Sequence, residues 1–394
     1  MLPVASFYYH YKNTSDTVNL GDYIQTLAVE AFYDQYFPDA EKITLDRDEL
    51  AFYSGKPALT IMQGWFSVPG NLDFIPGPNL IPVFIGTHFS LDIRKELVSP
   101  SSGFLDRFHN QEIGCRDYST MNYLRAFGGT AYLSRCLTLT FPRRTDSPEK
   151  QKTIFWVDVP DEISSLIPSV FHQNVEVVRQ RAIPYQPGRE STFRQKAAEL
   201  LKKYRDEACC VVTTAIHCAM PCASMGIPVL FLKFSDKNTA IERWSALHGI
   251  IPVYTRDDLE NGAIPNRIPD PPELEELKKN ILRNTYLSCL KAMGQELTPQ
   301  MTAEAAAARK YIAEFNRTGA PPYDFLRTKD AINTLYELWD LRDTLREIRR
   351  SPSYRIGQTI TWIPRKINGF FRCINENGWA YTAARIKHKI FRRS

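Results

Sequence analysis

Segments that read as buried strands alternate with segments that read as helices over about the first 270 residues, and this alternation constrains the fold more than any other feature. In the first half, helical periodicity predicts helices at 20–36 and 118–127, the second ending at a Gly-Gly pair. Short apolar runs predict strands at 4–9, 42–45, 58–62, 82–85, 112–115 and 131–136. Strands separated by helices are typical of a mostly parallel, doubly wound sheet.

A polar, proline-containing stretch without periodicity, residues 141–152, interrupts the alternation and reads as a linker between domains. After it the pattern restarts. Strands are predicted at 153–157, 175–178, 209–212, 229–234 and 251–254, and helices at 191–204, 217–225 and 239–247. We therefore expect an N-terminal α/β domain at 1–145 and a second α/β domain at 150–270.

Beyond residue 270 the strand signals stop, and helical segments follow at 272–296, 300–316 and 324–350. This predicts a helical extension at 271–350 and a separate tail at 351–394. The expected fold class is therefore α/β, with two doubly wound parallel-sheet domains facing across a cleft as in the GT-B architecture, plus the helical C-terminal extension. In open α/β sheets ligands bind at the carboxyl ends of the strands, so a site is expected in that cleft.

Composition excludes several other classes of protein. Of the 394 residues, 43% are hydrophobic and 24% are charged, which is typical of a globular chain and not of a disordered or fibrous one. No apolar run reaches the length of about eighteen residues that a transmembrane helix needs, and the first residues lack the features of a signal peptide. The eight cysteines are scattered without a CxxC pair, which indicates reduced thiols and a cytoplasmic location.

Positive charge is concentrated at the C-terminal end of the sequence. Residues 351–394 hold nine Lys and Arg residues and one acidic residue, a net charge of +8, whereas residues 1–350 have a net charge of −3. Trp, Ile and Phe residues are interleaved with these cations, which suits peripheral attachment to an anionic membrane surface. A C-terminal helix packed on the first domain is the alternative. No recognised nucleic-acid-binding module accompanies the basic run, so nucleic acid is not an expected partner.

The segment with the clearest chemical signal is 209–232. An apolar strand leads into Thr213 and Thr214, and His217 then opens a helix of small residues that ends at Gly226. The start of such a helix presents free N–H groups and a partial positive charge, which suit a phosphate or a carboxylate. A histidine on the first turn can exchange a proton near neutral pH, so His217 is a candidate acid or base. The alternative is a histidine that only caps or packs at the helix start.

The same segment resembles the signature of the polysaccharide pyruvyl transferase family. The run Val-Val-Thr-Thr-Ala-Ile-His-Cys-Ala-Met-Pro-Cys-Ala-Ser-Met-Gly-Ile-Pro-Val at 211–229 is similar to that family's Thr-Ser-Arg-Leu-His, small residues and Gly-x-Pro-Val. Asn19-Leu-Gly-Asp22 resembles its Asn-x-Gly-Asp element, and Gly114-Cys-Arg-Asp117 its Arg-Asp element. The resemblance covers about residues 1–260 in order. It departs from the pattern at Ala215, where the family usually has an arginine two residues before the histidine.

The resemblance implies an enzyme that transfers the pyruvyl group of phosphoenolpyruvate onto two hydroxyls of a sugar as a cyclic ketal, with release of phosphate. The implied partners are phosphoenolpyruvate and a glycan or lipid-linked oligosaccharide acceptor. The setting would be the synthesis of a bacterial capsule, exopolysaccharide or other surface polysaccharide. The first domain would bind the acceptor and the second the donor. No cofactor is implied.

The resemblance also implies roles for particular residues. His217 would transfer protons, and Asp22 would act as a base or hydrogen-bond acceptor for sugar hydroxyls, although a carboxylate near a helix start is also expected as a cap. The other acceptor-binding candidates are Asn19, Gly21 and His88. The donor carries a phosphate and a carboxylate and needs fixed cations and hydrogen-bond donors, for which the candidates are Thr213, Thr214, Arg116, Lys233 and Arg243. For Arg116, a salt bridge to Asp117 or a helix-cap contact is the competing interpretation.

Metal signals are weak. Asp46-Arg-Asp48 has the spacing of the Asp-x-Asp motif of metal-dependent glycosyltransferases, but we interpret it as a solvated loop, and Asp158-Val-Pro-Asp161 is equally nonspecific. No metal is expected, because the remaining histidines have no partners at ligand spacing. Two alternatives to pyruvyl transfer stay open: a GT-B-type glycosyltransferase that uses a nucleotide sugar, and an inactive member that serves as a scaffold in glycan assembly.

Overall fold

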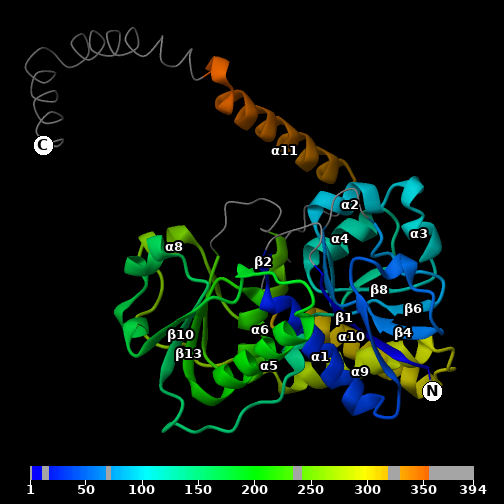
Figure 1. Cartoon of the computed structure of the whole chain (residues 1–394), viewed down its shortest axis with the longest axis horizontal. Helices are drawn as coiled ribbons and strands as arrows, with labels where there is room; N and C mark the ends of the chain where they lie inside the picture. Colours follow the sequence, from blue (N-terminus) through cyan, green and yellow to red (C-terminus); the bar gives the residue numbers. More distant parts are fainter. Residues whose placement is uncertain (1, 11–16, 68–71, 234–241, 318–328, 355–394) are drawn as a thin grey trace, which may run out of the picture. The chain divides into compact units, whose positions relative to one another are not determined.

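The computed structural model of the chain describes residues 2–10, 17–67, 72–233, 242–317 and 329–354 (Figure 1). The chain divides into two compact units, Met1–Lys329 and Asp330–Ser394, and each is described by itself. The first unit contains several parallel β-sheets with helices between their strands, which makes the fold α/β. In the second unit the described part is the helix α11 (Lys329–Arg350) and the few residues after it.

The first sheet of the N-terminal half is parallel throughout. The chain begins with β1 (Val4–Tyr8), continues through α1 (Leu20–Tyr36) and returns at β3 (Lys42–Asp46). β1 pairs with β3 on one side and with β4 (Ala58–Ile61) on the other. β6 (Leu80–Val83) completes the order β3-β1-β4-β6. The carboxyl end of β1 therefore lies at the centre of the sheet, close to the start of α1.

The N-terminal half contains a second four-stranded parallel sheet, because two of the predicted strands are each followed directly by a further short strand. After β4 the chain continues as β5 (Gly64–Phe66), and after β6 it continues as β7 (Thr87–Phe89). With β8 (Ile113–Cys115) and β9 (Ala131–Leu133) these strands take the order β5-β7-β8-β9. Gly86 precedes β7 with φ +66°, a left-handed conformation that glycine adopts without strain. The N-terminal half thus holds two parallel sheets instead of the single one predicted.

The second half builds a five-stranded sheet in which every pair of neighbours is parallel. Its order is β11-β10-β13-β14-β15, and its strands are β10 (Thr153–Val157), β11 (Val175–Val178), β13 (Ala208–Thr213), β14 (Val229–Leu232) and β15 (Val253–Tyr254). β13 is buried on both faces, as is typical of a central parallel strand. Val211 belongs to the main core, whereas Cys210 and Val212 point into a smaller cluster on the other face.

Two helices position the site between these sheets. α5 (Glu190–Glu207) packs beside α1, and α6 (Ile216–Ser224) follows β13 directly and also contacts α1 (Figure 1). The main core runs without interruption through both halves. The other elements of the first unit include β2 (Thr17–Val18), which pairs antiparallel with β12 (Ile183–Pro184), and the helices α2 (Leu91–Leu97), α3 (Phe104–Arg107), α4 (Tyr118–Ala126) and α8 (Arg256–Glu260).

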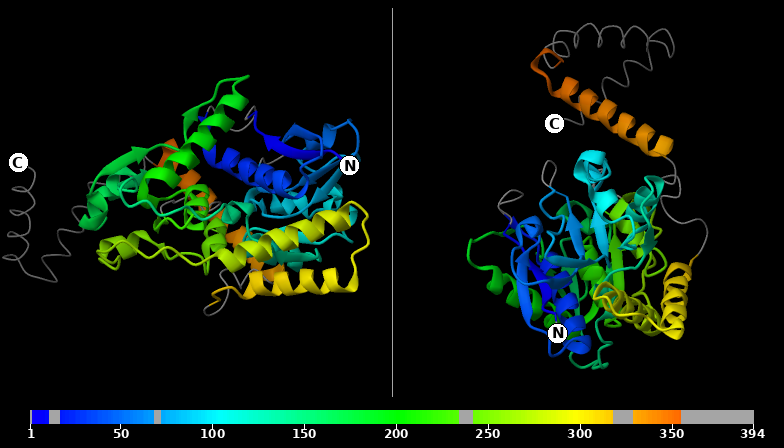
Figure 2. Two further views of the ribbon diagram at one scale, coloured as in Figure 1. Left: turned by 90° about the horizontal axis from the view of Figure 1, so that it is seen from below. Right: turned by 90° about the vertical axis from the view of Figure 1, so that its right-hand side faces the viewer.

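The predicted C-terminal helices are present. α9 (Glu275–Ala292) and α10 (Pro299–Glu314) run side by side (Figure 2) and belong to the first compact unit. α11 belongs almost entirely to the second. None of the helices in the described part of the chain combines the length and the hydrophobicity needed to cross a bilayer. The seven cysteines within the described ranges are free thiols.

Candidate functional site

The turn between β13 and α6 places His217 at the carboxyl end of the second sheet. The Thr213 hydroxyl donates to the Val157 carbonyl at 3.0 Å and accepts the Ala215 N–H at 2.9 Å, which ties the turn to the neighbouring strand. Ala215 occupies the N-cap position of α6 and has no side-chain acceptor to offer the first N–H groups of that helix. His217 itself has φ −86° and ψ 18°, in the sparsely populated bridge region where active-site residues often lie.

Arg116 reaches His217 from the other half of the chain. Arg116 follows β8 and is only 1% exposed. Its Nη1 group donates to the Gln25 side-chain oxygen at 3.0 Å and lies 2.9 Å from His217 Nε2. The Gln25 amide in turn donates to Asp22 at 3.3 Å. A guanidinium has no acceptor, so His217 Nε2 accepts this hydrogen bond and the ring proton of the neutral imidazole lies on Nδ1.

The surroundings keep His217 uncharged. Burial lowers the pKa of His217 well below its usual value, and the positive charges of Arg116 and Arg243 lower it further. Without a bound anion this imidazole is therefore a neutral hydrogen-bond donor at physiological pH. A negative charge placed beside it would oppose these effects and raise its pKa.

These residues enclose a cavity of about 40 Å³, the space of one or two water molecules. Its lining combines residues from both halves of the chain: Asn19, Asp22, Trp65, Arg116, Gln180, Arg181, Thr214, Ala215, Ile216, His217 and Arg243. Three of them are arginines and one is an acid, so the cavity favours an anion. The Arg181 side chain is 40% exposed, so it can move aside to admit a larger molecule.

Buried polar atoms without partners gather around this cavity. Trp65 Nε1, Arg116 Nε, Gln180 Oε1 and His217 Nδ1 find no hydrogen-bond partner among the residues that the structure describes. An unsatisfied buried polar group costs about 1–3 kcal/mol, so four of them in one place call for an explanation. A bound polar ligand that offers both acceptors and donors would satisfy them.

Several predicted site residues meet at the cavity. Asn19 is the N-cap of α1 and accepts the Gly21 N–H at 2.9 Å, and Asp22 lies in the first turn of that helix. Gly21 passes so close to the site that a β-carbon there would lie 3.1 Å from His217 Cβ. The Arg243 guanidinium lies 5.4 Å from the centre of the Trp65 ring, in a cation–π arrangement.

Other predicted site residues lie away from the cavity lining. Thr213 is buried beneath it in the turn described above. Lys233 is stacked over Trp244, with Nζ 4.9 Å from the ring centre. His88 is fully buried, and its Nδ1 group donates to Asp117 at 2.6 Å. Asp117 therefore pairs with a histidine, and Arg116 is left to face the cavity.

The Asp46–Asp48 segment corrects one expectation. It is not a solvated loop, because Asp46 and Arg47 are 8% and 3% exposed. Asp46 lies 2.5 Å from His10 Nδ1, and Arg47 pairs with Asp48. These ion pairs compensate the buried charges. Within the described ranges no cluster of three or more metal-ligating side chains is found.

Five cavity residues were not predicted as site residues: Trp65, Gln180 and Arg181, together with Ala215 and Ile216 inside the motif at 211–229. Gln25, which links Asp22 to Arg116, was also missed. The spacing of Gln25, one helical turn after Asp22, is a signal that could have identified it. Arg181 and Gln180 follow the carboxyl end of β11, where side chains of an open α/β sheet reach a ligand site. Trp65 carries no comparable signal.

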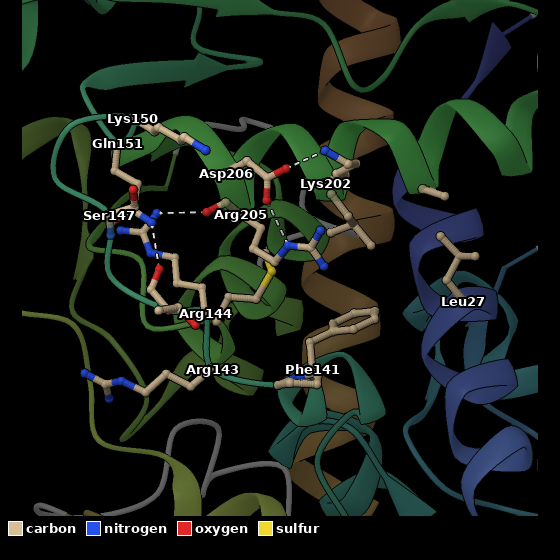
Figure 3. A pocket seen from close by; sticks show the side chains of 15 residues that line it. Leu27, Phe141, Arg143, Arg144, Ser147, Lys150, Gln151, Lys202, Arg205 and Asp206 are labelled. Atoms are coloured by element: carbon tan, nitrogen blue, oxygen red, sulfur yellow. Dashed lines mark hydrogen bonds and ion pairs between the residues drawn. The ribbon is translucent and has the colours of Figure 1, made fainter.

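A larger cavity of about 750 Å³ lies at the end of α6 opposite to His217, where the C-cap residue Met225 is part of its lining. Figure 3 shows the side chains that line it. Four of its five cations, all but Lys150, have protein partners in the described structure. Lys202 and Arg205 both bond to Asp206, and Arg144 donates to the carbonyls of Arg205 and Ala208 at the end of α5. Cations at this position stabilise the negative end of a helix. We therefore assign this cavity no part in the chemistry.

Acid is expected to destabilise the protein through its buried histidines. Burial lowers the pKa of His88 to about 3, although Asp117 opposes the shift. In the unfolded chain a histidine titrates near 6.5, so below that pH the unfolded state binds more protons and stability is lost as pH falls toward 3. The loss is about 1.4 kcal/mol per pH unit for each such group. Urea unfolding at pH 7, 6 and 5 checks this, and a free energy that stays constant would contradict it.

Of the comparisons with known proteins, the family model agrees with the sequence signature. The family model for polysaccharide pyruvyl transferase matches residues 19–236, a range that contains every cavity residue except Arg243. No match is found among curated proteins. Among solved structures, a functionally uncharacterized protein from Klebsiella pneumoniae is 16% identical, covering 64% of this chain and 92% of that chain, with a TM-score of 0.35.

Proposed function

The chain belongs to the polysaccharide pyruvyl transferase family, and we propose that it transfers the pyruvyl group of phosphoenolpyruvate onto two hydroxyls of a sugar to form a cyclic ketal. The observation that carries this proposal is the arginine-rich cavity in which Arg116 contacts His217. The sugar would belong to a glycan or lipid-linked oligosaccharide in bacterial surface-polysaccharide synthesis, such as a capsule or exopolysaccharide.

The donor matches the charge of the cavity. Phosphoenolpyruvate carries a phosphate and a carboxylate, and Arg116, Arg181 and Arg243 offer guanidinium groups that bind such anions through paired hydrogen bonds. Anionic oxygens would also accept hydrogen bonds from Trp65 Nε1 and His217 Nδ1, which find no partner within the described ranges. The donor needs more room than the present cavity gives, so its arrival requires the half-exposed Arg181 side chain to move.

The reaction can be balanced with two proton transfers. A proton added to the methylene carbon of the donor turns it into a methyl group and leaves an oxocarbenium-like centre at the neighbouring carbon. The first sugar hydroxyl attacks that carbon, the bond to the phosphate oxygen breaks, and the second hydroxyl attacks in turn. The two sugar hydroxyls release two protons. One of them returns to the group that protonated the methylene carbon, and the other leaves with the phosphate. The positive charge of the site stabilises the phosphate as it departs.

His217 is the group we propose for proton transfer. Its Nε2 atom accepts a hydrogen bond from Arg116 in the described state. When Arg116 turns to the donor, this nitrogen becomes free to take a proton from an acceptor hydroxyl. The negative charge of the donor raises the pKa of the imidazole at the same moment, so the proton is held and then passed on.

Asp22 is the residue we propose to bind the acceptor hydroxyls. Its side chain lies at the cavity, and its position in the first turn of α1 is fixed by the Asn19 cap and by the hydrogen bond from Gln25. A carboxylate accepts hydrogen bonds from two sugar hydroxyls and favours their deprotonation.

Thermal unfolding with added ligands tests the proposed donor. Phosphoenolpyruvate should raise the unfolding temperature, because a ligand that binds only the folded state stabilises it by about 2.7 kcal/mol at a hundred times its dissociation constant. UDP-sugars are the matched comparison. Stabilisation by a UDP-sugar alone would favour a glycosyltransferase, and stabilisation by neither would favour an inactive scaffold.

The tail at 351–394 is proposed to attach the protein to an anionic membrane, and most of it, residues 355–394, lies outside the described residues. Just before it, α11 exposes a stripe of apolar side chains at Leu338, Leu341, Leu345 and Ile348. Each Lys or Arg near an anionic surface contributes about 1 kcal/mol, so the net charge of +8 suffices for reversible binding.

Deletion of residues 351–394 should therefore release the protein from phosphatidylserine-containing liposomes in a flotation assay, while turnover of a soluble acceptor stays unchanged. The catalytic residues all lie in the compact unit that ends at Lys329, so the truncation leaves that unit intact. Neutral phosphatidylcholine liposomes are the control. If the truncated chain fails to fold, the helix-packing interpretation of the tail holds instead.

A further inference from the structure

The loop after β11 brings an arginine to the cavity from outside the three short sequence motifs at 19–22, 114–117 and 211–229. Arg181 lies three residues after β11 and lines the cavity together with Thr214 and Ala215. Its Nη2 group donates to the Thr214 hydroxyl at 2.6 Å. Thr214 is adjacent to Ala215, so the Arg181 guanidinium reaches the place beside the helix start where position 215 supplies no charge.

Asp158 holds this arginine in place. Its carboxylate accepts the Gln180 N–H at 3.1 Å, the Arg181 N–H at 3.3 Å and the Arg181 Nε–H at 3.1 Å. Its backbone carbonyl also accepts the Thr214 hydroxyl at 2.9 Å. Asp158 thus fixes both the backbone and the side chain of Arg181 and connects them to the turn before His217.

The backbone around this contact is strained. Asp158 has φ +54° and Ala182 has φ +61°, both in the left-handed region that non-glycine residues rarely adopt. Such conformations persist only where the surrounding contacts impose them, and they cluster at ligand-binding sites. The hydrogen bonds between Asp158 and the 180–181 backbone are the contacts that impose them here.

Arg181 has N–H groups left with which to bind a ligand. The bonds to Asp158 and Thr214 use two of its five N–H groups. Next to it, Gln180 is 1% exposed and its side-chain oxygen finds no partner in the described part of the chain. A buried and unpartnered amide beside a half-exposed guanidinium indicates that a polar molecule completes this corner of the cavity.

We propose that Arg181, positioned by Asp158, binds an anionic group of the donor and supplies from a neighbouring loop the charge that Ala215 does not provide. This inference rests on the proposed function and adds to it a donor-binding residue and the residue that positions it. The bound group is a phosphate or a carboxylate, which a guanidinium recognises in the same paired geometry.

Calorimetric titration of the full-length chain with phosphoenolpyruvate tests the proposal. Arg181→Ala should raise the dissociation constant at least tenfold and leave the unfolding temperature within a few degrees of the wild type, because the side chain is 40% exposed. The matched control is Arg179→Ala. Arg179 lies two residues away, is 56% exposed and pairs with Asp161 at the surface, so its loss removes the same charge and should leave donor affinity unchanged.

A second variant separates binding from structure. Arg181→Ala combined with Ala215→Arg should recover most of the lost affinity, because the new arginine enters the space that the old one leaves. If Arg181 had only a structural role, Ala215→Arg would not restore donor affinity.

Asp158→Asn tests the residue that positions Arg181. Asparagine tolerates positive φ but carries no charge, so this variant should raise KM for the donor while kcat changes little.

Competition with inorganic phosphate and with pyruvate identifies the bound group. If Arg181→Ala binds phosphate more weakly than the wild type, Arg181 binds the phosphate of the donor. If it binds pyruvate more weakly, Arg181 binds the carboxylate. If the wild type binds phosphoenolpyruvate and Arg181→Ala binds it equally well, the assignment of Arg181 is wrong while the proposed function stands. If the wild type does not bind phosphoenolpyruvate, the proposed function and this inference both fail.

Discussion

Replacement of His217 by alanine should lower turnover at least a hundredfold while the protein still folds. General acid–base help from a positioned side chain contributes about 10²–10⁴ to a rate, and His217 is the one titratable imidazole that lines the described cavity. The variant should fold because the ring makes one hydrogen bond within the described structure, to Arg116, and its Nδ1 group has no partner there. The measurement is the rate of phosphate release with phosphoenolpyruvate and an acceptor glycoside.

Replacement by glutamine separates hydrogen bonding from proton transfer. His217→Gln keeps an acceptor for Arg116 and a donor for the ligand, so donor affinity should be retained while turnover stays slow. The pH profile of the wild type should show a limb that comes from one ionisation, and this limb should be absent from the profile of His217→Gln. His109→Gln is the matched control, because His109 lies at the surface and bonds to the Asp106 carbonyl. Near-normal turnover of His217→Gln would contradict a role in proton transfer.

The second large effect is expected for Arg116. Arg116→Ala should weaken phosphoenolpyruvate binding between tenfold and a hundredfold, because hydrogen bonds to charged groups contribute about 1.5–3 kcal/mol. It should also move the pH profile of kcat/KM. The positive charge of Arg116 lowers the pKa of His217, so its removal raises that pKa. The acid limb, below which His217 is protonated and cannot act as a base, then shifts to higher pH.

Two further variants make this prediction specific. Arg116→Lys keeps the charge but cannot bridge Gln25 and His217, so it should restore the pH profile more than the affinity. Arg125→Ala controls for the loss of an arginine away from the site, since Arg125 is exposed, bonds to the Ala131 carbonyl and does not line the cavity. Equal donor affinity in Arg116→Ala and the wild type would contradict the donor-binding role.

Long regular elements were predictable because their periodicity repeats. α1 spans the predicted residues 20–36, and β10 and β11 lie at the predicted 153–157 and 175–178. β5 and β7, with three residues each, are too short for a period of two to appear in the sequence. A helix was predicted at 239–247, and its described part, Glu242–Leu247, is a 3₁₀-helix instead.

The candidate site was predictable where its residues lie next to a strand end or helix start. Asn19, Asp22, Arg116, Thr214 and His217 have such positions and meet at one cavity. Arg181 is held at the same cavity by the Asp158 carboxylate, which accepts hydrogen bonds from its backbone and its side chain. Asp158 and Arg181 are 23 residues apart in the sequence, so no local pattern indicates this contact, which depends on the tertiary structure.

The most direct test of pyruvyl transfer is mass spectrometry of an acceptor glycoside after incubation with the protein and phosphoenolpyruvate. We expect the glycoside to gain the mass of one pyruvate less one water, with one phosphate released for each product. With His217→Ala we expect neither the mass gain nor the phosphate. A mass gain equal to a hexose residue from a UDP-sugar, with phosphoenolpyruvate left intact, would contradict pyruvyl transfer.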